Sequence, residues 1–441
     1  MATLRNVALE ADLKDALKAA VDDFIAANPK SQAEDEKAAG AMPGGNTRTV
    51  LFYPPFPLTI NRGEDQFVWD IDEHKYTNFV GEFGAGLFGH SNPKIVDAIT
   101  RAVNDGTVLG GPNRYERILA AELVNRFPSL DKVRFTNSGT EANLMAISTA
   151  RAVSGKSKVM VFKGAYHGGV FMFAHGGSHI NAPFDYVMAP FNNAHDTVAM
   201  VDKNADELAC VVIEPMQGAG GMIPAEKAFL QALRDVTAKH GIILIFDEVV
   251  TSRLSGGGLQ KILGITPDMT TMGKYIGGGT TFGAFGGRED IMSRYDPRSA
   301  NAIGHAGTFN NNVITHAAGS TAMTQVYTPE VAESFNARGD TFRDRLNETI
   351  RKHSLPMCVT GLGTIMQVHC CEGPLRDEHD SERDNKIKGE LLFYDLLARG
   401  QRMTWRNSML LCLPMTDEDL DSYVDAFDDV LGARSHLLAA E

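Results

Sequence analysis

The stretch GIILIFDEVVTSRLSGGGLQKILGITPDMTTMGKYIGGG (Gly241–Gly279) decides the fold, because it contains two short elements that each lead into a charged residue. The first, Ile242–Phe246, is an apolar run too short for a helix, which is typical of a strand buried on both faces of a parallel sheet. It leads into Asp247. The second runs from Thr270 to Lys274, and the glycines that follow allow backbone to approach a bound group closely.

A carboxylate at the end of a buried strand and a lysine in an apolar, glycine-flanked turn are the two protein groups that pyridoxal phosphate requires. The lysine forms a Schiff base with the cofactor, and the carboxylate pairs with the pyridinium nitrogen. The rival interpretation of LIFDEV (244–249) is a Walker B strand, whose aspartate helps to hold a magnesium ion. That interpretation requires a P-loop, but Ala150 replaces the first glycine of the motif before Gly155-Lys156-Ser157. The sequence therefore favours pyridoxal phosphate over an ATPase.

Length, charge and cysteine usage limit the class of protein. The 441 residues suffice for one large α/β domain with a smaller one, and the net charge of −13, without a basic run, argues against nucleic acid or an anionic membrane surface as partner. Small-molecule substrates and a cytoplasmic location are expected, because no apolar run approaches a membrane span or a signal peptide. No disulfide framework or metal site is predicted from the five cysteines: Cys210, Cys358, Cys370, Cys371 and Cys412. A metal cluster at 369–371 is rejected because neighbours in a strand point to opposite faces.

The order of predicted elements indicates three parts. Residues 1–75 hold a helix (4–27), an extended proline-rich piece (51–60) and the start of a hairpin (67–79). Residues 76–327 alternate helices with short apolar strands, which predicts a mostly parallel sheet. Residues 328–441 form a smaller α+β unit with helices at 329–353 and 417–431. The strands predicted for the sheet are 132–136, 158–162, 208–213 and 242–246, and the helices between them are 94–103, 117–126, one from 141, and 228–240.

Ligands collect outside the carboxyl ends of strands in open α/β sheets, so the residues that follow each strand belong to one predicted site. TNSGTE (136–141) opens a helix, and its free backbone N–H groups and hydroxyls predict a phosphate site. A capping box formed by Ser138 and Glu141 is the alternative, and the two interpretations are compatible.

Three further segments add candidate site residues. Tyr166 lies in a glycine-rich stretch after a strand, where its ring can lie flat on a planar cofactor. Glu214 is another carboxylate at a strand end, and Thr308 adds a hydroxyl among small residues. The GxGxxG at Gly84–Gly89 lacks the preceding buried strand of a dinucleotide site and is interpreted as a close-packed loop.

Five motifs, in this order, carry a resemblance to a known family. They are NSGTEA (137–142), AYHG (165–168), EPMQG (214–218), DEV (247–249) and GKYIGGG (273–279). Together they resemble the class III aminotransferases of pyridoxal-phosphate fold type I, over nearly the whole chain. The resemblance implies an α/β fold with a mostly parallel central sheet flanked by helices, a smaller α+β domain, and a homodimer with shared active sites.

The resemblance also implies a role for each matching residue. Lys274 would form the Schiff base, Asp247 would pair with the pyridine nitrogen, and Tyr166 would stack on the ring. Thr308 would reach the phosphate of the other subunit's cofactor. The remaining cofactor-binding residues are Ser138, Gly139 and Thr140 of the phosphate cup, together with His167, Glu214 and Val249.

Within the family, the run from Pro43 to Ile60 most resembles aminotransferases of aromatic β-amino acids such as β-phenylalanine, near relatives of glutamate-1-semialdehyde aminomutases. The resemblance implies that Arg48 binds a substrate carboxylate and that Arg406 binds one in the other pocket. Two positions depart from the pattern. Trp405 replaces a small residue or proline, which affects the size of that pocket, and Val250 replaces a glutamine that many members place near the cofactor's phenolic oxygen.

The predicted reaction moves an amino group from a β-amino acid or aromatic amine to a keto acid, 2-oxoglutarate or pyruvate. Lys274 would act as the base, with a pKa lowered by an apolar pocket beside cationic groups, and Asp247 would keep the pyridine nitrogen protonated. The alternatives are an aminomutase, which needs no external keto acid, a general amine (omega) transaminase, and a catalytically silent relative. The full set of cofactor residues argues against the last of these.

Overall fold

A seven-stranded, mostly parallel sheet forms the centre of the computed structural model, which describes residues 2–439, with side chains from Leu9 onward. β10 pairs in parallel with β7 and β11, and β5 pairs in parallel with β6 and β7. Only β12 runs antiparallel to its neighbours in this sheet, which confirms the predicted α/β class. In spatial order the strands are β4 (Lys132–Thr136), β12 (Gly283–Gly287), β11 (Met269–Gly273), β10 (Ile243–Asp247), β7 (Leu208–Ile213), β5 (Lys158–Phe162) and β6 (Asp185–Ala189).

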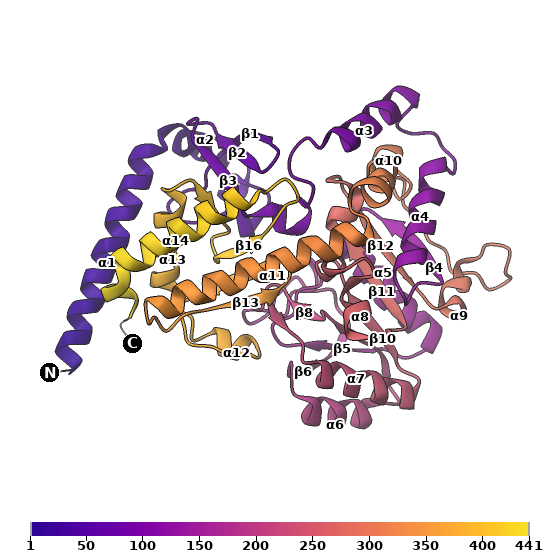
Figure 1. Ribbon diagram of the computed structural model, residues 1–441. Coiled ribbons are helices and arrows are strands. Elements are labelled where there is room, and N and C mark those ends of the chain that lie inside the picture. Colours follow the sequence, from indigo (N-terminus) through magenta and orange to yellow (C-terminus); the bar gives the residue numbers. More distant parts are fainter. Residues whose placement is uncertain (1, 440–441) are drawn as a thin grey trace.

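Helices cover the sheet, and their apolar faces complete its core. Every residue of β7 and β10 is buried, as expected for central strands whose sequences are continuous apolar runs. α5 contacts β11, β12 and β7, while α6 and α7 pack on each other at one end of the molecule (Figure 1). The helices of this region are α3 (Pro93–Asp105), α4 (Arg114–Arg126), α5 (Gly139–Ser154), α6 (Ala194–Asn204), α7 (Lys227–His240), α8 (Gly258–Leu263), α9 (Glu289–Met292) and α10 (Val313–Thr321).

The two ends of the chain pack together beside the sheet region. α1 contacts α13 and α14, and β15 joins the N-terminal hairpin to give a four-stranded sheet β1-β2-β3-β15. The long helix α11 runs between this part and the central sheet (Figure 1). The N-terminal elements are α1 (Ala2–Ala27), α2 (Pro29–Ala39), β1 (Ile60–Glu64), β2 (Phe67–Asp70) and β3 (Lys75–Asn78). The C-terminal ones are α11 (Pro329–Lys352), β13 (Cys358–Leu362), β14 (Ile365–His369), α12 (Glu378–Ser381), α13 (Lys386–Leu397), β15 (Gln401–Arg402), β16 (Ser408–Leu410) and α14 (Asp417–Leu438); β8 (Met216–Gln217) and β9 (Ile223–Pro224) form a separate small ribbon.

The proline-rich segment 51–60 packs as extended chain, as predicted. Tyr53, Phe56 and Leu58 are buried, and Phe24 of α1 contacts the rings of Tyr53, Phe56 and Tyr394. This segment therefore ties α1 to α13 and leads from the end of α2 toward the hairpin. The boundaries of the three predicted parts remain a prediction.

Several elements were not predicted from the sequence, among them α6, α8, α10 and α13, and three of the others have a clear reason. α2 is largely polar and follows α1 after a single residue, with Pro29 at its first position, so the proline that suggested an end also begins a helix. β6 is only partly buried, and β12 (GAFGG) is so rich in glycine that strand propensity is low. None of the helices that the structure describes combines the length and the apolar character needed to cross a membrane.

Gly283 in β12 tests how tightly this strand is fitted against the start of α5. A methyl group at Gly283 would lie 2.1 Å from Ser138 O and 2.3 Å from Thr136 Oγ1. Gly283→Ala should therefore lower the free energy of unfolding by about 1–3 kcal/mol, the range for overpacking, seen as a lower melting temperature. Gly304→Ala is the matched control, because its added methyl meets no atom within 4 Å. Equal melting temperatures for both variants would contradict this packing.

Candidate active site

The carboxylate of Asp247 ends β10 and is 4% exposed. Its Oδ2 accepts hydrogen bonds from Asn143 Nδ2 (2.8 Å) and from His167 Nδ1 (2.8 Å), and its Oδ1 accepts one from Val249 N (3.0 Å). A buried carboxylate is stable only when it is paired or hydrogen-bonded, and these donors supply that requirement. Asp247 is therefore held in one orientation at the carboxyl edge of the sheet.

Asn143 is a site residue that the sequence analysis missed. It lies in α5 and is buried; besides binding Asp247, its Nδ2 donates to His167 O (3.0 Å). Its Oδ1 accepts from Thr271 Oγ1 (2.7 Å) on β11. A polar residue inside a helix carries no distinctive local signal, and the one clue was its position two residues after the TNSGTE segment.

His167 follows β5 and is 2% exposed. Burial disfavours its charged form, but the hydrogen bond and the charge of Asp247, with a contribution from Glu214, outweigh that effect, so the pKa of His167 is raised. Its Nε2 has no hydrogen-bond partner among the described residues. His167 thus acts on Asp247 through Nδ1 and adds positive character beside the carboxylate.

Lys274 follows β11 and has a left-handed backbone, with φ of +53°. Its Nζ donates a hydrogen bond to Phe83 O. Gly84 lies against its side chain, since a Cβ at that glycine would be 3.2 Å from Lys274 Cδ. The predicted close-packed loop around Gly84 is therefore part of the lysine's own surroundings.

The pKa of Lys274 is lowered to about 8. Burial is the largest cause and the charge of Arg48 adds to it, while Asp247, Glu214 and Glu82 act in the opposite direction. The direction agrees with the sequence prediction. The lowered pKa increases the share of free Lys274 that is a neutral amine near neutral pH, which is the form that acts as nucleophile or base.

Ser138, Gly139 and Thr140 form the start of α5. Ser138 Oγ accepts from Glu141 N (3.2 Å), but the Glu141 carboxylate accepts from Asn137 N instead of completing a reciprocal capping box. Among the described residues, the backbone N–H groups of Gly139 and Thr140 have no acceptor. Unpaired N–H groups at a helix start favour an anion such as phosphate.

Thr140 and Val249 shape the walls of this helix start. Thr140 Oγ1 accepts from Gly169 N (3.1 Å), which joins the cup to the loop that carries Tyr166. The Val249 side chain packs on Gly139, where a Cβ would be 3.0 Å from both of its methyl carbons. Only glycine leaves this space open at position 139.

Glu214 anchors the loop of Tyr166. Its Oε2 accepts from Tyr166 N (2.8 Å) and its Oε1 from Gly218 N (3.0 Å). Burial, with the charge of Asp247, raises the pKa of Glu214 to about 7 although His167 opposes the shift. The Tyr166 residue is 44% exposed, so it is available to pack on a bound ring.

Arg48 lies near Lys274, because it contacts Glu82 and Phe83, and Phe83 O accepts the hydrogen bond of Lys274 Nζ. Its guanidinium forms an ion pair with Glu82 and lies 5.2 Å from the centroid of the Phe83 ring. The structure therefore brings together the predicted lysine, aspartate, stacking tyrosine and one of the two predicted arginines.

Three other positions singled out from the sequence have surroundings that differ from those of Arg48: Arg406, Trp405 and Val250. Arg406 Nη1 donates to His175 Nε2 (2.9 Å), and burial lowers the pKa of the guanidinium. Trp405 stacks on Tyr53, with ring centroids 5.7 Å apart and an interplanar angle of 17°. Val250 packs in a small apolar cluster that includes Met216, Met222, Leu254, Leu259, Ile365 and Leu410.

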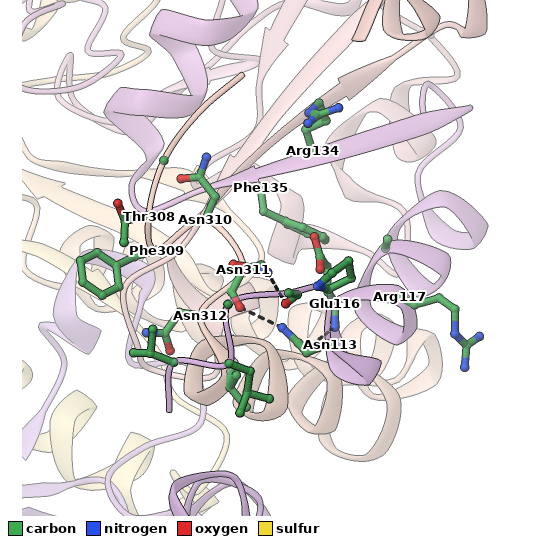
Figure 2. A pocket seen from close by; sticks show the side chains of 18 of the residues that line it. Asn113, Glu116, Arg117, Arg134, Phe135, Thr308, Phe309, Asn310, Asn311 and Asn312 are labelled. Atoms are coloured by element: carbon green, nitrogen blue, oxygen red, sulfur yellow. Dashed lines mark hydrogen bonds between the residues drawn. The ribbon is translucent and has the colours of Figure 1, made fainter. Parts of the chain in front are cut away.

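Thr308 is not brought to Lys274 within this chain. It is exposed in a pocket of about 780 Å³ between the loop 305–312 and the start of α4 (Figure 2). Asn113 Nδ2 donates to Asn311 O (2.8 Å) across this pocket. Thr308 thus faces outward, as a residue serving another subunit would.

The described residues fit pyridoxal phosphate. Unpaired N–H groups at the start of α5 match a phosphate, and the buried Asp247 carboxylate matches a cationic ring nitrogen. Lys274, with its lowered pKa, offers the amine for the aldehyde. No metal-binding group of three His, Cys, Asp or Glu side chains occurs in the part of the chain that the structure describes.

Comparison with known proteins gives one consistent family. The family model described as aminotransferase class-III matches residues 52–431. A beta-phenylalanine transaminase from Variovorax paradoxus is 46% identical over 436 residues, 99% of each chain. A solved beta-phenylalanine aminotransferase from that organism has a TM-score of 0.94 at 46% identity and covers 96% of this chain and 98% of its own. A glutamate-1-semialdehyde 2,1-aminomutase from Rhodopirellula baltica is 36% identical over 426 residues, 92% of this chain and 97% of that protein. The chain therefore belongs to the class III aminotransferases and is a pyridoxal-phosphate-dependent aminotransferase of fold type I.

Proposed function

We propose that this aminotransferase takes its amino group from an aromatic β-amino acid and passes it to 2-oxoglutarate or pyruvate. The observation that carries the proposal is the position of Arg48 against Glu82 and Phe83, because Phe83 O accepts the hydrogen bond of Lys274 Nζ. A guanidinium beside the reacting amine supplies a fork for a donor's carboxylate. The similarity to a beta-phenylalanine transaminase supports the same donor class.

Lys274 and Asp247 carry the chemistry in this proposal. Pyridoxal phosphate, when bound, supplies an electron sink and carries the amino group between the two substrates. Lys274 Nζ is the amine that would hold the cofactor's aldehyde and, once freed, would move the proton at the substrate carbon. The Asp247 carboxylate, fixed by Asn143 and His167, would hold a proton on the pyridine nitrogen.

The remaining cofactor contacts orient the ring and its phosphate. Ser138, Gly139 and Thr140 would bind the phosphate through backbone N–H groups and hydroxyls, and Tyr166 and Val249 would pack on the ring. His167 and Glu214 act through their neighbours: His167 holds Asp247, and Glu214 holds the backbone of Tyr166. These are positioning roles that keep the ring in register with Lys274.

The two arginines would bind the carboxylates of the two substrates. Arg48 would take the β-amino acid's carboxylate, and Arg406 the carboxylate of the acceptor in the other pocket. Trp405 is fixed by its stacking on Tyr53 and by an edge contact with Phe393 (5.0 Å between centroids), so it is a rigid wall beside Arg406. Such a wall restricts the size of the groups admitted there.

A homodimer is part of the proposal. Val108, Leu109 and Phe309 are exposed and line the pocket that contains Thr308 (Figure 2). Exposed apolar side chains gathered at one place are typical of a surface that another chain covers. A second copy there would place Thr308 beside the partner's cofactor phosphate. A cytoplasmic location also stays a prediction from the sequence.

A half-reaction with β-phenylalanine tests the proposed function. Purified holoprotein mixed with this donor alone should convert the cofactor's absorbance in a single turnover and release a keto acid, and 2-oxoglutarate or pyruvate should restore it. Lys274→Ala should do neither. An aminomutase would instead return an isomerised amino acid without an acceptor, and a general amine transaminase would prefer 1-phenylethylamine; either result would replace the proposal.

Arg48→Ala tests the recognition of the donor carboxylate. Loss of charge-assisted hydrogen bonds should reduce kcat/KM for β-phenylalanine by about 10- to 150-fold, corresponding to about 1.5–3 kcal/mol. The value for 1-phenylethylamine should be spared, because this amine has no carboxylate. Equal losses for both donors would show that Arg48 supports the site in general and does not recognise the acid.

A further inference from the structure

Glu82 stands out because its backbone is strained and its side chain points at the predicted substrate arginine. Gly81, Glu82, Phe83 and Gly84 all have left-handed φ values, of +51°, +47°, +54° and +104°. Such values are uncommon for residues with a Cβ, and strained backbone of this kind persists where the surroundings enforce it, often at functional sites.

The surroundings that enforce this conformation belong to the active site. Phe83 O accepts the hydrogen bond of Lys274 Nζ, and Gly86 N donates to Gly81 O (2.9 Å) to close the turn. Gly81 packs against β16, because a Cβ at Gly81 would be 2.3 Å from Leu410 O. The turn is therefore fixed between Lys274 and β16, and it directs the Glu82 carboxylate to Arg48.

We infer that Glu82 is a specificity-determining residue: its carboxylate binds Nη1 of Arg48 until the carboxylate of a donor displaces it. This inference rests on the proposed role of Arg48 in binding donors. A donor with a carboxylate replaces one anion by another beside Arg48. A donor without a carboxylate leaves the Arg48–Glu82 ion pair in place, so the positive charge of Arg48 stays neutralised by Glu82.

The exposure of the pair makes this exchange feasible. The side chain of Arg48 is 42% exposed and that of Glu82 is 53% exposed. Exposed ion pairs are weak, and a displaced Glu82 carboxylate is readily solvated. Displacement should therefore weaken the binding of a carboxylate ligand only a few-fold, which leaves Arg48 usable for recognition.

The exchange also preserves the electrostatics at Lys274. The charge of Arg48 lowers the pKa of this lysine, whereas the charge of Glu82 raises it. A substrate carboxylate that takes the place of Glu82 on the guanidinium substitutes for the same negative charge. The base thus meets a similar field with either type of donor.

The test measures binding of 3-phenylpropanoate, a carboxylate without an amine, to the holoprotein by titration calorimetry. Glu82→Gln keeps a hydrogen-bond acceptor but removes the competing charge, so the Kd should fall by about twofold to fivefold. Glu207→Gln is the control, because the exposed Glu207 carboxylate pairs with the partly buried Lys158 (2.9 Å) at the opposite, amino end of the sheet strands. Its Kd should equal that of the wild type.

A second arm separates competition from a general change of charge. In an Arg48→Ala background, Glu82→Gln should leave the Kd for 3-phenylpropanoate unchanged, because no fork remains to compete for. Steady-state kinetics should show a lower KM for β-phenylalanine in Glu82→Gln, with no improvement for 1-phenylethylamine.

Three outcomes would overturn the inference: an unchanged or weaker Kd in Glu82→Gln, the same gain in the Arg48→Ala background, or equal gains for both donors. Failure of the proposed function is seen separately. In that case Arg48→Ala alone would not weaken 3-phenylpropanoate or β-phenylalanine, whatever Glu82→Gln does.

Discussion

The buried negative charge of Asp247 is the constraint on which the site depends. A carboxylate this far from water needs hydrogen-bond donors, and here they come from three segments: Asn143 in α5, His167 after β5, and Val249 in its own turn. Thr271 of β11 in turn orients Asn143. The charge is stable only when α5 lies on the sheet and β5, β10 and β11 are in order. The arrangement that holds this charge therefore also brings the start of α5, the Tyr166 loop and Lys274 to one edge.

Arg48 and Arg406 have hydrogen-bond partners of different charge, which gives the two proposed carboxylate sites different properties. Arg48 is paired with the carboxylate of Glu82, whereas Arg406 donates to the neutral nitrogen of His175. An arginine with an internal anion binds an incoming carboxylate by exchange, while one with a neutral partner binds it by addition. The site for the donor would thus tolerate both acids and amines, and the site for the acceptor would favour acids.

A site residue could be predicted from the sequence when its residue type is unusual among its neighbours in the chain. Lys274 and Asp247 were identified because a charge in an apolar or glycine-rich run is rare, and the strands around them were placed as short apolar runs that alternate with helices. Asn143 was missed because a polar residue inside a helix is common, and its importance arises only from contacts with distant segments. β12 was missed because neighbouring strands stabilise a glycine-rich sequence of low propensity. The pairing of Glu82 with Arg48 depends on a strained turn, and no local sequence pattern predicts that turn.

The most direct measurement is the protonation state of the cofactor's pyridine nitrogen, read from the ¹⁵N chemical shift of holoprotein loaded with pyridoxal phosphate labelled at that atom. The wild type should show a protonated nitrogen, because the charge of Asp247 is held beside it. Asp247→Asn keeps the shape but removes the charge and turns one of the two acceptor oxygens into a donor, so the pyridine nitrogen should be neutral. A protonated nitrogen in Asp247→Asn, with the cofactor still bound, would contradict the central claim that this buried charge governs the site.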